Sequence, residues 1–159
     1  MIRLVLVVAL TFWATAAQAF TGVVSHITDG DTIWVQPEGT QRKPVKVRLQ
    51  GIDAPERCQA GGAQATAALK SRLLHQRVEV ETVAKDTYHR TLGHVRLKGE
   101  DIAAWMVSQG QAWSAHGRVG NLGPYGAQER QARAARRGIF AGDRAIEPRV
   151  FRKMHGPCG

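Results

Sequence analysis

Hydrophobic and polar residues alternate in short runs from residue 20 to residue 97, with turn residues between the runs. Five of these runs, rich in β-branched residues, are predicted as strands: residues 21–27, 32–36, 45–49, 78–83 and 92–97. Turn signals separate several of them, such as Asp29 with Gly30 and Lys98 with Gly99. Short strands with frequent turns are typical of a small barrel or sandwich rather than a parallel sheet.

Helical spacing of apolar residues predicts three helices, at residues 63–74, 102–109 and 125–137. Asp101 is the expected N-cap of the second helix, and Gly110 is its expected stop. The remaining stretches carry Gly, Pro and charge without periodicity and are predicted as loop and tail: residues 114–124 and 141–159. The pattern thus favours an α+β domain that is mainly β.

The first 19 residues have the character of a signal peptide. Arg3 gives a positive start, an apolar run follows, and Ala17-Gln18-Ala19 forms a small-x-small cleavage site, so the mature chain is expected to begin at Phe20. A retained membrane anchor is the alternative, but polar residues interrupt the run before the roughly 20 apolar residues that a span needs. We therefore expect export to the periplasm or the medium, with no stable membrane span after cleavage.

The domain organisation expected for the mature chain is one domain over residues 20–140 and a basic tail over residues 141–159. The formal net charge is +9, which favours polyanionic partners such as nucleic acids. The two cysteines, Cys58 and Cys158, are too few for a thiolate zinc site and suit one disulfide. Two separate buried thiols are the alternative.

Three short segments carry residues suited to phosphodiester hydrolysis, which needs a cation, a base and phosphate-binding arginines. Their sequences are Asp29-Gly30-Asp31-Thr32, then Arg48-Leu49-Gln50-Gly51-Ile52-Asp53-Ala54-Pro55-Glu56, and lastly Asp86-Thr87-Tyr88-His89-Arg90. Each segment alone is weak evidence, because a solvated turn or ordinary surface charges would explain it as well or better. Their combination, in this order and spacing, is far more specific.

Together the three segments resemble the staphylococcal nuclease family, and the resemblance covers roughly residues 20 to 140. It implies a five-stranded OB-fold barrel with three helices, acting as a calcium-dependent nuclease on DNA or RNA with low sequence specificity and leaving 3′-phosphates. We expect a monomer.

The resemblance also assigns roles to the acidic residues. Asp31 and Asp53 are similar to the carboxylate ligands of Ca²⁺, and the backbone carbonyl of Ala54 to a further ligand. Asp29 is similar to an outer-shell acid that orients water around the ion. Glu56 resembles the general base for the attacking water, or at least the residue that orients that water.

The same resemblance assigns the substrate contacts. Arg48 and Arg90 are similar to the two guanidinium groups that bind the scissile phosphate, and Tyr88, which shapes the turn beside Arg90, is a candidate substrate contact. His89 stands before Arg90 where the family often has glycine, so the backbone of this turn is an open question.

The family's nucleotide-stacking tyrosines have no clear counterpart. Candidate replacements are His116, Arg118 and Tyr125, with Trp113 better explained by core packing. The charged residues of the tail could extend a nucleic-acid track, although a solvated terminal cluster is the default: Arg149, Arg152 and Lys153.

Two rival functions remain at this point. A nucleic-acid-binding module on the same barrel, catalytically weak or inactive, would explain the charge but not the retained acids and arginines. A basic structural protein of the cell envelope would explain charge and export, and it too leaves the acid and arginine set without a purpose.

Overall fold

The computed structural model describes residues 18–115, 123–156 and 158. Most of the predicted signal peptide lies outside these residues, so its cleavage after Ala19 stays a prediction. The elements in chain order are β1 (Ala19–Asp29), β2 (Thr32–Pro37), β3 (Val45–Leu49), β4 (Ile52–Asp53), α1 (Gly62–Leu73), β5 (Arg77–Lys85), β6 (Thr91–Leu97), β7 (Glu100–Asp101), α2 (Ile102–Ser108), β8 (Trp113–Ser114), α3 (Gly126–Ala134), a 3₁₀ turn η1 (Gly138–Phe140) and α4 (Pro148–His155).

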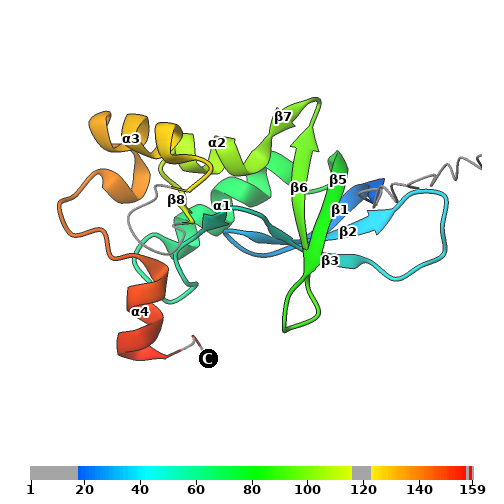
Figure 1. Cartoon of the computed structure of the whole chain (residues 1–159), viewed down its shortest axis with the longest axis horizontal. Coiled ribbons are helices and arrows are strands. Elements are labelled where there is room, and N and C mark those ends of the chain that lie inside the picture. Colours follow the sequence, from blue (N-terminus) through cyan, green and yellow to red (C-terminus); the bar gives the residue numbers. More distant parts are fainter. Residues whose placement is uncertain (1–17, 116–122, 157, 159) are drawn as a thin grey trace, which may run out of the picture.

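Five strands close into a barrel (Figure 1). The strands follow the order β3-β2-β1-β5-β6, with antiparallel neighbours throughout, and a parallel pairing between β3 and β6 joins the two edges. Closure removes the free sheet edges that would otherwise invite aggregation. The predicted OB-fold barrel is confirmed, and each predicted strand matches an observed one to within two residues at either end.

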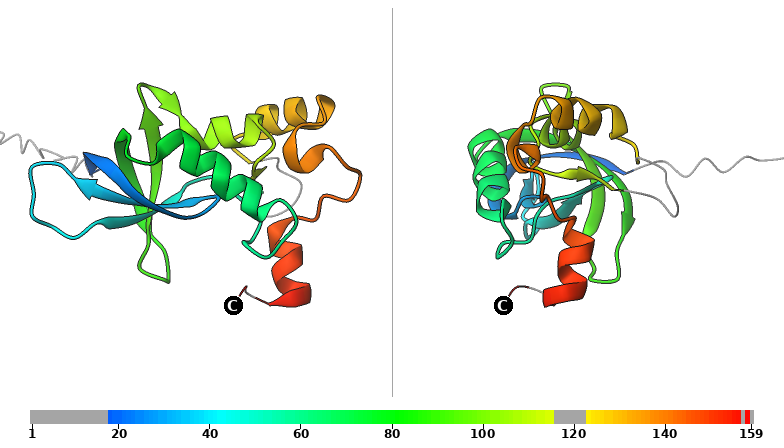
Figure 2. Two further views of the ribbon diagram at one scale, coloured as in Figure 1. Left: turned by 180° about the vertical axis from the view of Figure 1, so that it is seen from behind. Right: turned by 90° about the vertical axis from the view of Figure 1, so that its left-hand side faces the viewer.

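Alternate residues of the barrel strands point inward and form the core, as the alternating pattern requires. These side chains are almost fully buried: Val24, Ile33, Val35, Val47, Leu49, Val78, Val80 and Val95. Helix α1 packs against the barrel through Leu69 and Leu73, both 0% exposed, and lies across its face in Figure 2. The acidic loop that precedes α1 is thereby held at one end of the barrel.

Asp101 begins α2 and also fixes α3. One of its carboxylate oxygens accepts a hydrogen bond from the backbone N–H of Ala104 at 3.1 Å, which confirms the predicted N-cap. The other accepts from the Tyr125 hydroxyl at 3.0 Å, beside the N-terminus of α3. A single carboxylate therefore ties together two consecutive helices.

The predicted tail over residues 141–159 was wrong in one respect, because Pro148–His155 forms the helix α4. Pro148 stands in the first turn, where its missing N–H costs nothing. Its apolar residues Val150, Phe151 and Met154 fall at helical spacing, a pattern that the sequence reading missed, and its position depends on contacts with residues distant in sequence. Ser114, predicted as loop, instead pairs with Ile52 in a short two-stranded sheet of β4 and β8.

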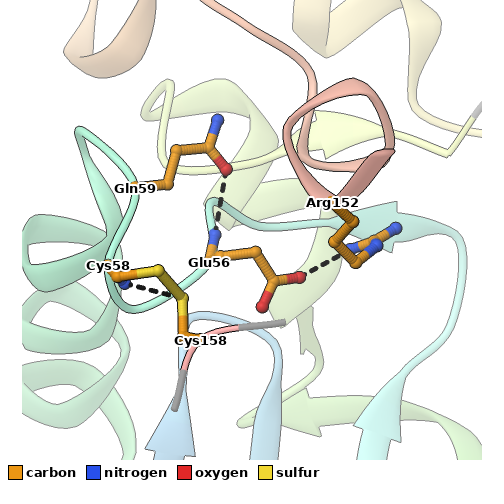
Figure 3. The surroundings of a disulfide bond; sticks show 5 residues. All are labelled: Glu56, Cys58, Gln59, Arg152 and Cys158. Atoms are coloured by element: carbon orange, nitrogen blue, oxygen red, sulfur yellow. Dashed lines mark hydrogen bonds and ion pairs between the residues drawn. A yellow bond between two sulfur atoms is a disulfide. The ribbon is translucent and has the colours of Figure 1, made fainter. Parts of the chain in front are cut away.

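A disulfide joins Cys58 to Cys158, as predicted, with their Cα atoms 5.8 Å apart (Figure 3). The bond links the loop before α1 to the segment that follows α4, across 100 positions of sequence. Within the described part of the chain, no helix has the length and apolar character needed to cross a membrane.

Replacing Asp101 by alanine is expected to lower the free energy of unfolding by about 1 to 3 kcal/mol, because the helix loses its cap and the Tyr125 hydroxyl loses its acceptor. Urea unfolding of the two proteins measures this difference. Asp143→Ala is the matched control: its side chain is 92% exposed and forms a surface ion pair with Arg136, so a change within about 0.5 kcal/mol is expected. Equal losses in both variants would show that the cap contributes nothing.

Candidate active site

Two loops at one end of the barrel bring the predicted acids together. Asp31 follows the β1–β2 turn and is 3% exposed, and its Oδ2 accepts a hydrogen bond from the Ala54 backbone N–H at 2.9 Å. Gly30 makes this approach possible, since a Cβ at that position would lie 2.7 Å from the Ala54 Cβ. The turn and the loop after β3 therefore form one packed unit.

Arg48 lies between two of the predicted metal ligands. It is placed on β3 opposite Thr32, the residue that follows Asp31. Its Nη1 pairs with Asp31, and its Nη2 donates to Asp53 Oδ1 at 2.9 Å. A guanidinium with part of its surface still accessible is thus held by two carboxylates at the place where a phosphate is expected to bind.

The electrostatics of the acid pair are unequal. Burial, followed by the charge of Asp31, raises the pKa of Asp29 from its ordinary value of 3.8 to about 6. Burial also opposes ionisation of Asp31, but the positive charge of Arg48 and the Ala54 amide outweigh it and lower the pKa of Asp31. Burial and the ionised Asp31 thus both oppose ionisation of Asp29, and a cation bound beside the pair would favour the ionised form.

Glu56 projects from a loop whose backbone is fixed on both sides. Its N–H donates to Gln59 Oε1 at 3.1 Å, and its carbonyl accepts from the Gln59 N–H at 2.8 Å. Gly62 packs directly under this carbonyl, leaving no room for a Cβ, which would lie 2.0 Å from it. The Glu56 side chain, 26% exposed, remains accessible to solvent.

Arg152 of α4 completes the group. Its Nη1 lies 2.7 Å from Glu56 Oε1, and its Nη2 lies 3.0 Å from Asp53 Oδ2 (Figure 3 shows the contact with Glu56). Sequence reasoning assigned Arg152 only to a possible nucleic-acid track, with a solvated cluster as the default. The cysteine pair was the one signal of proximity, because Cys58 follows Glu56 by two positions and so brings the end of the chain near the acids, but it does not indicate which tail side chain contacts them.

The second predicted arginine lies in the β5–β6 turn. Arg90 pairs with Asp86 at 2.7 Å, and its guanidinium lies 5.4 Å from the centre of the Tyr88 ring. Within the described residues it is bound to Asp86 rather than to the acids around Arg48. His89 has φ of 58°, so this turn keeps the left-handed backbone that glycine favours.

The predicted base-contacting residues have different surroundings. Tyr88 is 78% exposed, so its ring is accessible to a ligand although Arg90 lies over it. Tyr125 is only 7% exposed, and its hydroxyl is bound to Asp101, a position that serves packing and leaves little ring surface for a base. His116 and Arg118 lie outside the described residues. Trp113 packs edge-on against Phe140, which confirms its predicted place in the core.

The donor set around Asp31 has the chemistry of a hard cation site. In residues 18–115, 123–156 and 158, no three His, Cys, Asp or Glu side chains are arranged to hold a metal, and arginines bridge the carboxylates instead. Asp31 and Asp53 offer carboxylate oxygens, each of which already has an ion-pair or hydrogen-bond partner. The carbonyl of Ala54 is the third predicted donor, and the N–H of the same residue donates to Asp31. Carboxylate and carbonyl oxygens are the donors that Ca²⁺ prefers, so the chemistry of the predicted ligands suits this cation.

Known proteins match this chain over most of its length. Protein ParB of Escherichia coli is 38% identical over 160 residues, covering 94% of this chain and 86% of that protein. Micrococcal nuclease of Shigella flexneri is 36% identical, covering 94% and 87%, and an uncharacterized endonuclease of Haemophilus influenzae is 35% identical, covering 82% and 72%. The family described as "Staphylococcal nuclease homologue" matches residues 46–142, which include Arg48, the acids of the second loop and the Arg90 turn. The chain therefore belongs to the staphylococcal nuclease family.

Proposed function

We propose that this protein is an exported, calcium-dependent nuclease that hydrolyses phosphodiester bonds of DNA or RNA with low sequence specificity and leaves 3′-phosphates. The observation that carries the proposal is the position of Arg48 between Asp31 and Asp53, with Glu56 on the same loop. Family membership and the nuclease names of the relatives support it.

Arg48 is the main phosphate ligand in this proposal. Its two terminal nitrogens are oriented by carboxylates, so little side-chain entropy is lost when a phosphate oxygen binds. Burial lowers the pKa of Arg48, but the negative charges of Asp31 and Asp53 raise it by more. The guanidinium therefore stays positive throughout the physiological pH range. A fixed positive charge stabilises the extra negative charge that develops on phosphorus during hydrolysis.

Asp31, Asp53 and the carbonyl of Ala54 would hold the Ca²⁺ ion, with Asp29 orienting water nearby. When bound, a divalent cation supplies charge neutralisation for the phosphodiester. Asp31 is preorganised for this role, because hydrogen bonds from Thr32 and Ala54 fix both of its oxygens.

Glu56 takes the proton from the attacking water. Its backbone is anchored by Gln59 while its carboxylate reaches solvent, the combination that a general base needs. Arg90 is the second guanidinium, carried by a turn whose β6 strand pairs with β3 beside Arg48. Tyr88 offers an exposed ring for unpaired bases, and His116 and Arg118 are the further candidate contacts, whereas the buried Tyr125 serves packing.

Export follows from the predicted signal peptide, and the Cys58–Cys158 disulfide suits an oxidising compartment. The strong net positive charge would concentrate the protein on nucleic acids outside the reducing cytoplasm.

The direct test is digestion of heat-denatured DNA and of RNA by the mature protein, with Ca²⁺ or with a chelator. We expect cleavage only with Ca²⁺, and product ends that a phosphatase can modify. Binding of the polymer without strand scission, with Ca²⁺ and with the chelator, would favour a nucleic-acid-binding module. The pairing of Arg152 with Asp53 and Glu56 is the observation behind this alternative, because it occupies two of the proposed catalytic acids.

Replacing Glu56 by glutamine is expected to reduce kcat by roughly 10² or more with little change in KM, because the loop keeps its shape while the base is lost. Steady-state kinetics on a short single-stranded oligonucleotide would measure both constants. Glu81→Gln on the exposed face of β5 makes the same chemical change away from the acid loops and should leave both constants unchanged. An unaltered kcat for the Glu56 variant would remove this residue from the chemistry.

Asp29→Asn is expected to stabilise the cation-free protein at neutral pH. The pKa of Asp29 is about 6 in the folded protein and 3.8 ordinarily, so as the pH rises the unfolded chain releases the Asp29 proton before the folded protein does. The free energy of unfolding of the wild type therefore falls between about pH 4 and 6, and it stays lower at higher pH. The variant should therefore gain about 1 to 3 kcal/mol at about pH 7.5 and nothing near pH 3. Urea unfolding with a chelator at both pH values measures this, and an equal effect at both would contradict the assignment.

A further inference from the structure

Helix α4 carries a basic side chain onto the two acids that the proposed chemistry uses. We propose that Arg152 is an internal counter-ion for Asp53 and Glu56, which a divalent cation must displace, and that the Cys58–Cys158 disulfide holds Arg152 in place. The inference rests on the proposed function, because it names a residue that sets the affinity of that site for its cation.

The contacts of Arg152 are specific to these acids. Both terminal nitrogens are engaged: Nη1 with Glu56 Oε1 at 2.7 Å and with Asp53 Oδ1 at 3.3 Å, and Nη2 with Asp53 Oδ2 at 3.0 Å. Asp53 is shared with Arg48, so both of its oxygens already face a guanidinium. A cation that takes Asp53 as a ligand must therefore compete with Arg152 for the same oxygens.

The disulfide joins the same two segments as the ion pair. Cys58 lies two positions after Glu56, and Cys158 lies six positions after Arg152. A hydrogen bond from the Cys58 N–H to Cys158 Sγ at 3.0 Å and one from Gln59 Nε2 to the Ile146 carbonyl at 2.6 Å add to this link. Such a tether gives Arg152 a high effective concentration at the acids, whereas an untethered exposed ion pair would be weak.

The helix itself is lightly packed. Only Pro148 among its residues is buried, and its apolar Val150 and Met154 are 44% and 55% exposed. Figures 1 and 2 show α4 standing beside the rest of the molecule at the end of a long connection from α3. Arg152 can therefore leave the acids without disturbing the barrel core, and the disulfide limits how far it goes.

This competition lowers the apparent affinity for the cation, because only molecules whose acids are free of Arg152 can bind it. Removing the guanidinium should remove that factor. The proposal differs from a phosphate-binding role, in which Arg152 would contribute to the binding of substrate and have no effect on the cation.

Calorimetric titration of the disulfide-bonded protein with Ca²⁺, without nucleic acid, tests the inference. Arg152→Ala is expected to bind Ca²⁺ roughly three- to tenfold more tightly than the wild type. Lys153→Ala is the matched control, since it removes the same charge from the neighbouring, exposed position of α4 and should change the affinity by less than about twofold. Unchanged or weaker binding by the Arg152 variant, or equal tightening in the control, would overturn the proposal.

The role of the tether is tested with the double variant Cys58→Ser/Cys158→Ser, which leaves no unpaired thiol. It should bind Ca²⁺ more tightly than the wild type, by less than Arg152→Ala, and adding Arg152→Ala to it should then have a smaller effect. Full additivity of the two changes would overturn the role of the disulfide.

The proposed function fails in a different way from this inference. If the wild type and all variants cleave nucleic acid with the same dependence on Ca²⁺, the nuclease assignment holds and the role of Arg152 is wrong. If neither the wild type nor Arg152→Ala binds Ca²⁺, the calcium site itself is wrong and the inference falls with it. A higher KM for DNA in Arg152→Ala with unchanged Ca²⁺ affinity would instead identify a substrate-binding arginine.

Discussion

The contact of Arg48 with Asp31 and Asp53 is the interaction on which the site depends. It compensates a nearly buried carboxylate at the end of a barrel, and it joins β3 to the two loops that carry the acids. Without a positive charge there, Asp31 would be unfavourable in its ionised form, as Asp29 already is. The same guanidinium is thus a structural counter-ion and a candidate phosphate ligand, so stability and proposed function use one side chain.

Much of this arrangement could be predicted from local patterns. Alternation gave the five barrel strands because inward and outward residues of a strand differ in burial, and Asp101 was recognisable as a cap from its place before an apolar helix. The acids and Arg48 were found through the resemblance, because their order and spacing lie within short segments. What these signals have in common is that each depends on residues close together in sequence.

The features that could not be predicted depend on long-range contacts. Helix α4 places Val150, Phe151 and Met154 at helical spacing, but so short a pattern does not show where the helix packs, and Arg152 differs from Arg149 only in the partners that the fold gives it. The cysteine pair constrained the tail, but a disulfide gives proximity and not the direction of a neighbouring side chain. Similarly, the left-handed backbone at His89 follows from the hairpin geometry and overrides the usual preference of the residue type.

The parallel pairing of β3 with β6 has a consequence for the order in which this molecule assembles. Hairpins between consecutive strands form early because their contacts are local, whereas the pairing of Val47 with Thr91 must close a long loop of chain. Asp31 and Arg48 are brought together by local hairpins, whereas Arg90 comes near them only when β3 and β6 pair. The second arginine of the site therefore depends on a non-local strand pairing, so a change that weakens the pairing of β3 with β6 would displace Arg90 while leaving the contact of Arg48 with Asp31 in place.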